Sequence, residues 1–276
     1  MQEILRLENI SYFYGKDRTN RAALSEVSLS FKRGEKTAVI GNNGAGKSTL
    51  FLCCNGVLQP QRGTLYLQGE KPVNTVKDRL RQRQMVGLVF QDADSQMIGA
   101  TIEKEISFGP MNLGLSKAEV ADRVEMVIRR LGLEELRKRA PHEISGGEKK
   151  RVSIADILVM DSELILLDEP AAGLDPLHRR QLELLLDELA VTGIGLVVAT
   201  HDLDFAWRWA ERIIIMKDGK IEADGDPEEI FANREILEDC GLDYPQLFEV
   251  GRILGMNPLP KRIEELKNLD KVMMTD

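Results

Sequence analysis

The stretch Gly41-Asn42-Asn43-Gly44-Ala45-Gly46-Lys47-Ser48 matches the pattern Gly-x-x-x-x-Gly-Lys-Ser/Thr, which is typical of a phosphate-binding loop. The apolar, β-branched run 37–40 before it predicts a buried strand, and 49–54 after it predicts a helix. Glycines let backbone N–H groups curl around phosphate oxygens, and the start of a helix adds a partial positive charge. Lys47 can bind the outer phosphates, and the Ser48 hydroxyl can bind Mg²⁺.

The alternative for this stretch is a glycine turn beside a surface lysine. That alternative does not require all of the matched positions, nor a strand before them and a helix after them. We therefore expect the loop to bind a nucleoside triphosphate. The residues expected to contact it are Gly41, Asn42, Asn43, Gly44, Ala45, Gly46, Lys47, Ser48 and Thr49.

Composition limits the protein class. The 276 residues are 43% hydrophobic and 30% charged, which suits one large α/β domain with or without a small appendage. The net charge of −8 argues against nucleic acid as a partner. Three scattered cysteines fit a reducing cytoplasm. The N-terminus predicts no signal peptide, and no apolar run reaches the ~18 residues of a membrane span. We therefore expect any work at a membrane to go through a partner.

Several segments predict strands by alternation or by unbroken apolar runs. The expected strands are 4–10, 23–31, 65–67, 86–90, 164–167 and 195–200, followed by a hairpin of 213–216 with 220–223. Residues 92–160 change character and predict a helical insertion between two strands of the nucleotide-binding sheet. Within it, Ser116 and Glu119 form a capping-box pattern, and Pro141 is expected to stop a further helix. Asp226 is expected to cap a later helix with a reciprocating glutamate, and the remainder predicts a small helical tail.

Polar residues follow three of these strands at the edge where a ligand binds. Asp168 ends the run 164–167 and suits Mg²⁺ held through water, while Glu169 suits a base that activates the attacking water. The alternative is two acids that cap the next turn. Gln91 can touch a ligand, and His201 is expected to face the phosphates, although a lone histidine is more often structural.

An aromatic cluster, Tyr12-Phe13-Tyr14, follows the first strand. Such rings usually pack in the core, but one of them could stack on a nucleotide base. Position alone favours neither interpretation.

Taken together, these motifs resemble the ABC-type ATPase family over nearly the whole chain. Ile144-Ser145-Gly146-Gly147-Glu148 is similar to the family signature, and 164–169 to its second nucleotide motif. Ala172-Gly173-Leu174-Asp175 is similar to its dimer-contact loop. Gln91 and His201 match its glutamine and histidine switches, and Tyr14 matches the aromatic residue that stacks on the base.

The resemblance implies an α/β fold: a RecA-like P-loop core with an antiparallel β subdomain, a helical signature subdomain and a C-terminal helical extension. The implied domains are an ATPase domain over 1–240, with the helical subdomain at about 92–160, and a dimerisation tail over 241–276. It also implies Mg²⁺-dependent ATP hydrolysis. The implied catalytic residues are Glu169, His201 and Gln91, and the implied Mg²⁺ ligands are Ser48, Gln91 and Asp168.

The resemblance further implies that two ATP molecules lie between two head-to-tail ATPase chains. Lys47, Ser48, Asp168 and Glu169 of one chain would then face the signature of the other. The signature residues acting in trans would be Ser145, Gly146, Gly147 and Glu148, and Asp175 would contact the partner chain.

One branch of the family fits best, the energy-coupling-factor importers. Residues 101–115, Pro141-His142 before the signature and Lys149-Lys150-Arg151 after it are similar to that branch, and most similar to its cobalt/nickel-importer subunit. The resemblance implies a peripheral protein on the cytoplasmic face of the membrane. Its partners would be a second ATPase (identical or paralogous), an integral membrane coupling subunit received by 91–109, and a small membrane subunit that binds the cargo. The vitamin importers are close relatives and supply the alternative cargo.

The chain departs from the family pattern in four places. Asn42 stands where proline is common, Glu148 replaces a glutamine, Ala171 replaces Thr or Ser, and 93–97 lacks the usual proline-containing acidic pattern. The last departure affects contact with the membrane partner. A soluble family member acting on ribosomes or DNA is the rival hypothesis, but such proteins carry two ATPase domains or a long coiled coil, and this sequence has neither pattern.

Overall fold

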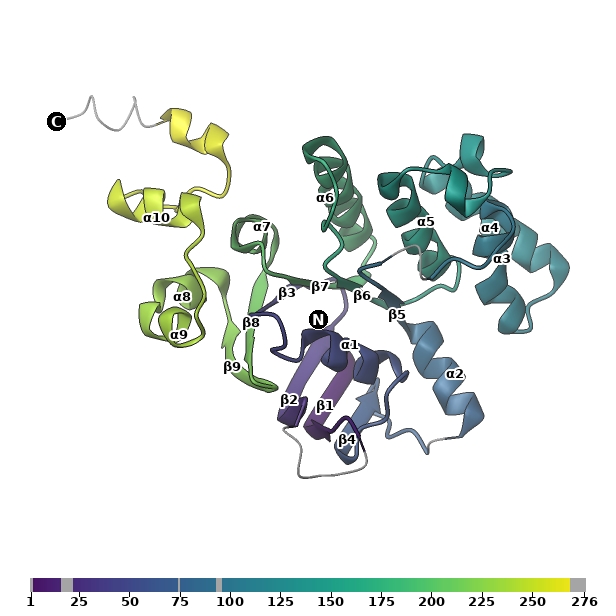
Figure 1. Cartoon of the computed structure of the whole chain (residues 1–276), viewed down its shortest axis with the longest axis horizontal. Coiled ribbons are helices and arrows are strands. Elements are labelled where there is room, and N and C mark those ends of the chain that lie inside the picture. The colour runs from purple at the N-terminus through teal and green to yellow at the C-terminus, as the bar shows by residue number, and fades with distance from the viewer. Residues whose placement is uncertain (1, 16–21, 74, 93–95, 269–276) are drawn as a thin grey trace.

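A six-stranded sheet forms the centre of the protein in the computed structural model, which describes residues 2–15, 22–73, 75–92 and 96–268. Its strand order is β5-β6-β7-β3-β8-β9 (Figure 1). Five strands are parallel, and the last pairs antiparallel with β8. In sequence order they are β3 (Lys36–Ile40), β5 (Val86–Val89), β6 (Leu164–Asp168), β7 (Gly195–Thr200), β8 (Arg212–Lys217) and β9 (Lys220–Gly225).

A second, antiparallel sheet of three strands lies on one side of the first. It has the order β2-β1-β4, with β1 (Glu3–Tyr12), β2 (Leu24–Lys32) and β4 (Arg62–Leu67). Helix α1 (Lys47–Asn55) lies between the two sheets, and α2 (Val76–Met85) runs from this layer back to β5 (Figure 1). The expected β subdomain and the strand–loop–helix unit around the phosphate-binding loop are therefore confirmed.

Each central strand contributes to two cores because successive side chains point to opposite faces. The face toward α1 carries Val39, Leu166, Val197 and Ile214. The opposite face carries Ile40, Leu167, Val198 and Ile215. All of these residues are at most 1% exposed, so the strands that carry them are buried on both faces. The edge strand β9 has no buried residue.

Helices cover the second face and extend beyond one edge of the sheet. The helical insertion is confirmed as α3 (Ile102–Asn112), α4 (Lys117–Arg130) and α5 (Gly146–Leu158), and the Ser116–Glu119 capping box forms as expected. The prediction of a helix that ends at Pro141 is wrong. The chain there makes only short 3-10 turns, Glu134–Leu136 and Pro141–Glu143. Proline begins the second turn because its fixed φ and missing N–H suit a first helical position.

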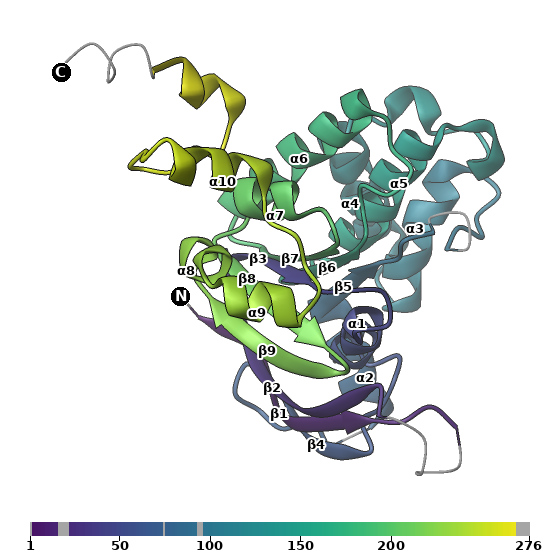
Figure 2. The same cartoon turned by 60° about the vertical axis from the view of Figure 1, so that its left-hand side comes forward.

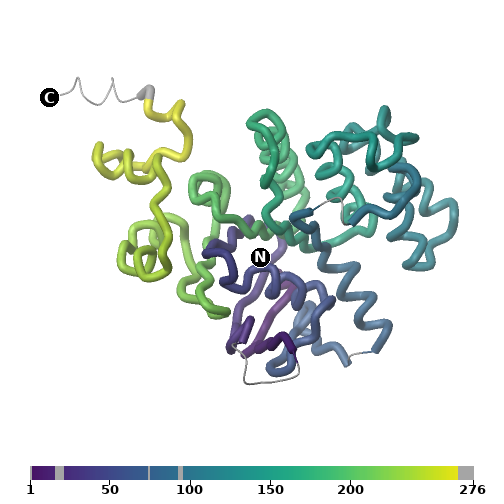
Figure 3. The backbone as a smooth tube through the Cα atoms, viewed as in Figure 1, coloured from purple at the N-terminus to yellow at the C-terminus, as the bar shows by residue number. Residues whose placement is uncertain are grey.

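The C-terminal part returns to the opposite end of the molecule from the helical insertion (Figures 1 and 3). After α6 (Pro176–Val191) and α7 (Leu203–Trp209), the chain forms α8 (Pro227–Ala232), α9 (Arg234–Asp239), α10 (Gln246–Ile253) and a 3-10 turn, Ile263–Asn268. Asp226 caps α8 by accepting the Glu228 N–H, but the expected reciprocal glutamate bond does not form. Figure 2 shows α10 beside α7. Trp207 joins these parts, because its ring packs edge-on against Phe248 and its Nε1–H donates to the Pro260 carbonyl at 2.9 Å.

Candidate nucleotide-binding site

The phosphate-binding loop follows β3 directly and depends on glycine for its shape. Gly46 has a φ of 109°, and a Cβ there would lie 2.7 Å from the Ala23 carbonyl oxygen. A Cβ on Gly41 would clash with the Met216 carbonyl oxygen. Because Gly46 is the N-cap of α1 and has no side chain, no side-chain bond occupies the start of this helix. Its first N–H groups can therefore bind an anion.

Lys47 is held inside its own loop. Its ammonium donates to the Gly41 carbonyl at 2.6 Å and to the Asn42 carbonyl at 3.4 Å, and the residue is only 7% exposed. Burial lowers the pKa of Lys47, while the carboxylates of Glu169 and Asp168 act in the opposite direction. The lysine therefore already lies beside both acids that the sequence assigned to the site.

A cavity of about 290 Å³ opens over the loop. It joins the loop with the ends of β5 and β6 and with the segment after β1. The described residues that line it are Tyr14, Ala23, Asn43, Gly44, Ala45, Gly46, Lys47, Ser48, Thr49, Gln91, Asp168 and Glu169. The sequence missed Ala23, because only the tertiary fold brings the start of β2 to the loop.

Glu169 occupies a strained position at the end of β6. Its φ is 44°, in a region that a residue with a Cβ seldom adopts. Its N–H donates to the Ala199 carbonyl at 2.9 Å, and its side chain is 12% exposed. The Nδ1 atom of His201 lies 3.0 Å from Glu169 Oε1. His201 itself is 72% exposed and contacts Glu169 instead of lining the cavity.

The aromatic cluster divides between two environments. Tyr12 packs against the core under α1, while Tyr14 is 51% exposed and lines the cavity. The Tyr14 hydroxyl lies 3.2 Å from Thr49 Oγ1, and its ring packs edge-on against Tyr12 with centroids 5.0 Å apart. Of the three aromatic residues, Tyr14 therefore has a ring available at the mouth of the site.

The signature segment lies at the start of α5 and does not line the cavity. Ser145 and Glu148 form a capping box, in which the Glu148 carboxylate accepts the Ser145 N–H at 2.7 Å and its hydroxyl at 2.8 Å. These hydrogen bonds hold the pKa of Glu148 below its usual range. Gly146 and Gly147 supply the first helical N–H groups. Gly147 packs on His178, leaving no space for a Cβ.

Three other predicted residues, Gly41, Asn42 and Asp175, also lie outside the cavity. Asp175 caps α6, where it accepts the His178 N–H at 3.0 Å and lies 2.7 Å from His178 Nδ1. Asn42 donates its side-chain amide to the Cys240 carbonyl at 2.9 Å, which ties the loop to the end of α9. The sequence missed His178 and Cys240 as neighbours of these motifs, because only contacts distant along the chain define them.

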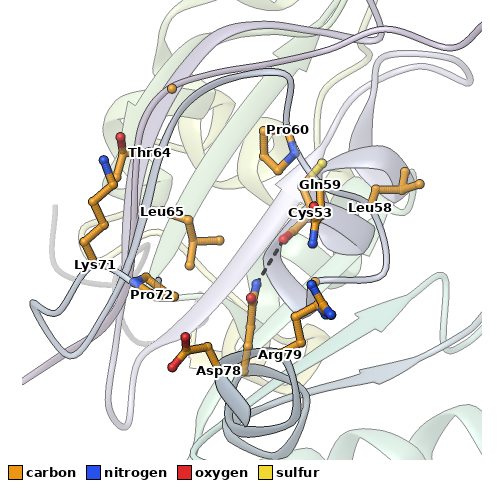
Figure 4. A pocket seen from close by; sticks show the side chains of 13 residues that line it. Cys53, Leu58, Gln59, Pro60, Thr64, Leu65, Lys71, Pro72, Asp78 and Arg79 are labelled. Carbon is orange, nitrogen blue, oxygen red and sulfur yellow. Dashed lines mark hydrogen bonds between the residues drawn. The ribbon is translucent and has the colours of Figure 1, made fainter. Parts of the chain in front are cut away.

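The structure has a second cavity, of about 190 Å³, behind α1 (Figure 4). Its walls come from the end of α1, from β4 and from α2, and they include Cys53, Leu65 and Gln82. The Gln82 amide donates to the Cys53 carbonyl at 3.3 Å. No residue of the phosphate-binding loop lines this cavity.

No helix in the described ranges combines the length and hydropathy needed to cross a bilayer. No group of three or more His, Cys, Asp or Glu residues suited to a metal ion occurs among the described residues.

The fold and the site together define a P-loop nucleotide-binding protein. The family model "ABC transporter" matches residues 24–172, which is more than half of the chain. An energy-coupling factor transporter ATP-binding protein, EcfA2, from Methanospirillum hungatei is 44% identical over 92% of this chain, which spans 63% of that relative. The corresponding EcfA protein from Methanococcus maripaludis is 41% identical over 91% of this chain and 89% of its own length.

Solved structures agree with these relatives. CbiO1 from Clostridium perfringens, described as part of the ABC transporter complex cbiONQ, superposes with a TM-score of 0.76 at 36% identity, over 93% of this chain and all of that one. The dimeric bacterial ABC transporter cassette MJ0796 superposes with a TM-score of 0.72 at 28% identity, over 81% of this chain and 99% of that one. The chain therefore belongs to the ABC transporter ATP-binding proteins. It is an ATPase of that family, similar to the energy-coupling-factor type.

Proposed function

We propose that this protein is the ATP-hydrolysing motor of an energy-coupling-factor importer, which couples ATP binding and hydrolysis to uptake of cobalt or nickel ions. The observation that carries the proposal is the cavity in which Lys47, Asp168 and Glu169 meet at the start of α1. The similarity to CbiO1 favours the metal ion as cargo. A vitamin is the alternative cargo, because a separate membrane subunit would bind the cargo in either case.

The residues of the cavity divide the work of ATP hydrolysis. The ammonium of Lys47 exchanges its loop carbonyls for the outer phosphates, and the N–H groups of the loop and of α1 bind the remaining oxygens. The Tyr14 ring stacks on the base. Glu169 accepts a proton from the attacking water, and the strained backbone and His201 hold its carboxylate in place. Gln91 contributes its side chain at the edge of the cavity.

The donor set of the cavity fits Mg²⁺. Ser48 offers a hydroxyl, Gln91 an amide oxygen and Asp168 a carboxylate, and Mg²⁺ prefers such oxygen ligands. These three residues would hold the ion together with phosphate oxygens. When bound, the ion neutralises charge that develops on the phosphates.

A second ATPase chain, identical or paralogous, would complete the site. Ser145, Gly146, Gly147 and Glu148 start α5 outside the cavity of their own chain, so the N–H groups at the start of this helix can face an ATP held by a partner. The Ser145 hydroxyl would have to exchange the Glu148 carboxylate for the nucleotide. Asp175 would contact that partner. The dimeric form of MJ0796 supports this arrangement.

The membrane partner would dock on the surface that follows β5. Ile98 is 69% exposed, Met111 is 63% exposed and Phe108 is half exposed, so the range 91–109 and the end of α3 present apolar side chains to solvent. Residues 93–95, within the segment that departs from the family pattern, lie outside the described residues. The protein would act as a peripheral subunit on the cytoplasmic face of the membrane, beside an integral coupling subunit and a small cargo-binding subunit.

The proposed domain division places the ATPase domain at 1–240, its helical subdomain at about 92–160 and a dimerisation tail at 241–276. The exposed apolar side chains of Ile253, Leu254 and Ile263 support a role for the tail in association. Residues 269–276 lie outside the described residues.

Affinity capture from detergent-solubilised native membranes, followed by mass spectrometry, tests the importer assignment. The proposal predicts a large integral membrane protein and a small membrane protein in the eluate, and the small protein identifies the cargo. A different ATPase in the eluate would indicate a heterodimer. Recovery of soluble partners or ribosomes alone would favour the rival soluble ABC protein and overturn the transport assignment.

A further inference from the structure

A buried lysine joins the signature helix to the nucleotide cavity. Lys150 lies in the second turn of α5 and is only 4% exposed. Its ammonium donates to the Phe90 carbonyl at 3.1 Å and to the Gln91 carbonyl at 2.9 Å. These partners lie 60 and 59 residues earlier in the chain. Lys150 therefore ties the start of α5 to the end of β5.

The directions of the Phe90 and Gln91 carbonyl groups show that Lys150 holds a turn of the backbone. In an extended strand, successive carbonyls point in opposite directions, so two neighbours cannot both face one cation. The chain at Phe90 and Gln91 has left β5 and turned both oxygens toward Lys150. The lysine thus stabilises the turn from which the Gln91 side chain enters the cavity.

Two carboxylates, those of Asp92 and Asp168, lie near enough to act on this buried ammonium. Burial lowers the pKa of Lys150, while the carboxylates of Asp92 and Asp168 act in the opposite direction. Asp168 lines the same cavity as Gln91. A buried cation stabilised by carbonyl oxygens and nearby acids is costly to disturb, since loss of the donor leaves polar groups without partners.

We propose that Lys150 is a positioning residue that holds Gln91 in the cavity and couples it to the signature helix. The inference rests on the proposed function, in which Gln91 binds Mg²⁺ and α5 acts on the ATP of the partner chain. Each chain then carries a rigid link between its own ATP site and the one it completes in its partner. Closure of the signature on one ATP is transmitted through Lys150 to Gln91 at the other.

The test compares Lys150→Met with a matched control, Arg151→Met. Arg151 is the next residue of α5, and its guanidinium donates to the Leu131 carbonyl at 3.4 Å, away from the cavity. Both substitutions remove a bond from a cation to a carbonyl, but only the first releases Gln91. The measurements are steady-state ATP hydrolysis against Mg²⁺ concentration, and nucleotide binding by a fluorescent ATP analogue, with the protein in its captured complex.

Lys150→Met is expected to raise the Mg²⁺ concentration for half-maximal activity by about 10–100-fold, as loss of a metal ligand's outer partner typically does. Nucleotide binding without Mg²⁺ should stay within about twofold, and Arg151→Met should leave the Mg²⁺ dependence unchanged. On a Gln91→Ala background, Lys150→Met should add nothing further, since it acts through Gln91. Lys150→Gln keeps a side-chain N–H donor group and should shift the Mg²⁺ dependence less. It also serves as a second variant if Lys150→Met does not fold.

A Mg²⁺ dependence that matches the wild type in both Lys150 variants would overturn the inference. So would an effect of Lys150→Met that multiplies fully with that of Gln91→Ala. Failure of the proposed function looks different: affinity capture would then recover soluble partners alone, while the wild type and Arg151→Met would still show Mg²⁺-dependent ATP hydrolysis.

Discussion

Lys47 and Glu169 show how single residues are prepared for chemistry before a nucleotide is present. The ammonium of Lys47 donates hydrogen bonds to carbonyl groups of its own loop. An entering phosphate can replace these carbonyl groups as the acceptor at little structural cost. Glu169 keeps a backbone conformation that costs about 1–3 kcal/mol and is maintained by the surrounding sheet. Such strain at the end of a core strand favours a catalytic role over a helix-capping one.

Glu169→Gln should retain ATP binding and lower turnover by roughly 10²–10⁴, because an amide cannot accept the proton of the attacking water. Steady-state hydrolysis and a fluorescent ATP analogue measure the two effects separately. Lys47→Ala is the contrasting variant and should lose nucleotide binding itself. Normal hydrolysis by Glu169→Gln would remove this residue from the mechanism.

Asp156 is expected to make the stability of the fold depend on pH. It lies on α5, both of its carboxylate oxygens are buried, and they lack a hydrogen-bond partner among the described residues. Burial raises the pKa of Asp156 well above its usual range, and Glu105 adds to the rise. The folded state therefore binds this proton more tightly than the unfolded state. Stability from Asp156 is fully present below the unfolded-state pKa near 4, and is lost as pH rises through the folded-state pKa.

Asp156→Asn stays neutral and should remove this dependence. Its unfolding free energy relative to the wild type should increase with pH, at most by about 1.4 kcal/mol per pH unit. Urea denaturation at pH 5, 6.5 and 8 measures the difference. A constant difference across this range would show that Asp156 does not titrate in this way.

At the scale of elements, α4 and α5 begin with the same capping box but serve different purposes. Ser116 with Glu119 and Ser145 with Glu148 each satisfy the first N–H groups of a helix. Only the start of α5 carries the signature glycines. This pair of helices separates the contribution of a cap to folding from its contribution to catalysis.

Ser145→Ala and Ser116→Ala should each lower the unfolding free energy by about 0.5–2 kcal/mol, the usual cost of losing an N-cap side chain. Only Ser145→Ala should also reduce ATP hydrolysis. Denaturant unfolding and steady-state assays of both variants supply the comparison. Equal activity of the two variants would mean that the Ser145 hydroxyl takes no part in ATP hydrolysis.

The sequence predicted those elements whose formation depends on neighbouring residues along the chain. The apolar runs at 164–167 and 195–200 became buried strands, and the glycines of the loop predicted its position and shape. The helix expected before Pro141 was wrong, because a proline that begins a turn leaves the same mark in the sequence as one that ends a helix. In the sequence, Lys150 appeared only within Lys149-Lys150-Arg151, a similarity to one branch of the family. Its role was not predicted, because its carbonyl partners are brought near only by the folded chain.

At the scale of the whole molecule, the C-terminal segment from α8 to α10 is part of the core. Phe248 of α10 is fully buried, 5.0 Å from the Trp207 ring and 6.1 Å from the Phe231 ring, measured between centroids. The Asn42–Cys240 hydrogen bond joins the same end of the molecule to the phosphate-binding loop. The segment therefore cannot move independently of the ATPase domain without breaking buried contacts.

Phe248→Ala should lower the unfolding free energy by about 3–5 kcal/mol, as loss of a buried phenylalanine usually does. Ile253→Ala on the same helix removes an 80% exposed side chain and should change it little. Urea denaturation of both variants tests the packing. Equal, small effects would show that α10 is not docked on α7.

The central claim is that two ATPase chains share each ATP site, and the mass of Glu169→Gln in solution tests it most directly. This variant is expected to bind ATP without hydrolysing it, so a dimer formed with ATP should persist. Light scattering can then measure the mass of the complex, and any second ATPase subunit that co-purifies is kept in the sample. ATP is expected to shift the mass from one ATPase chain to two, and ADP is not. A mass that remains that of one chain at saturating ATP would contradict the shared site.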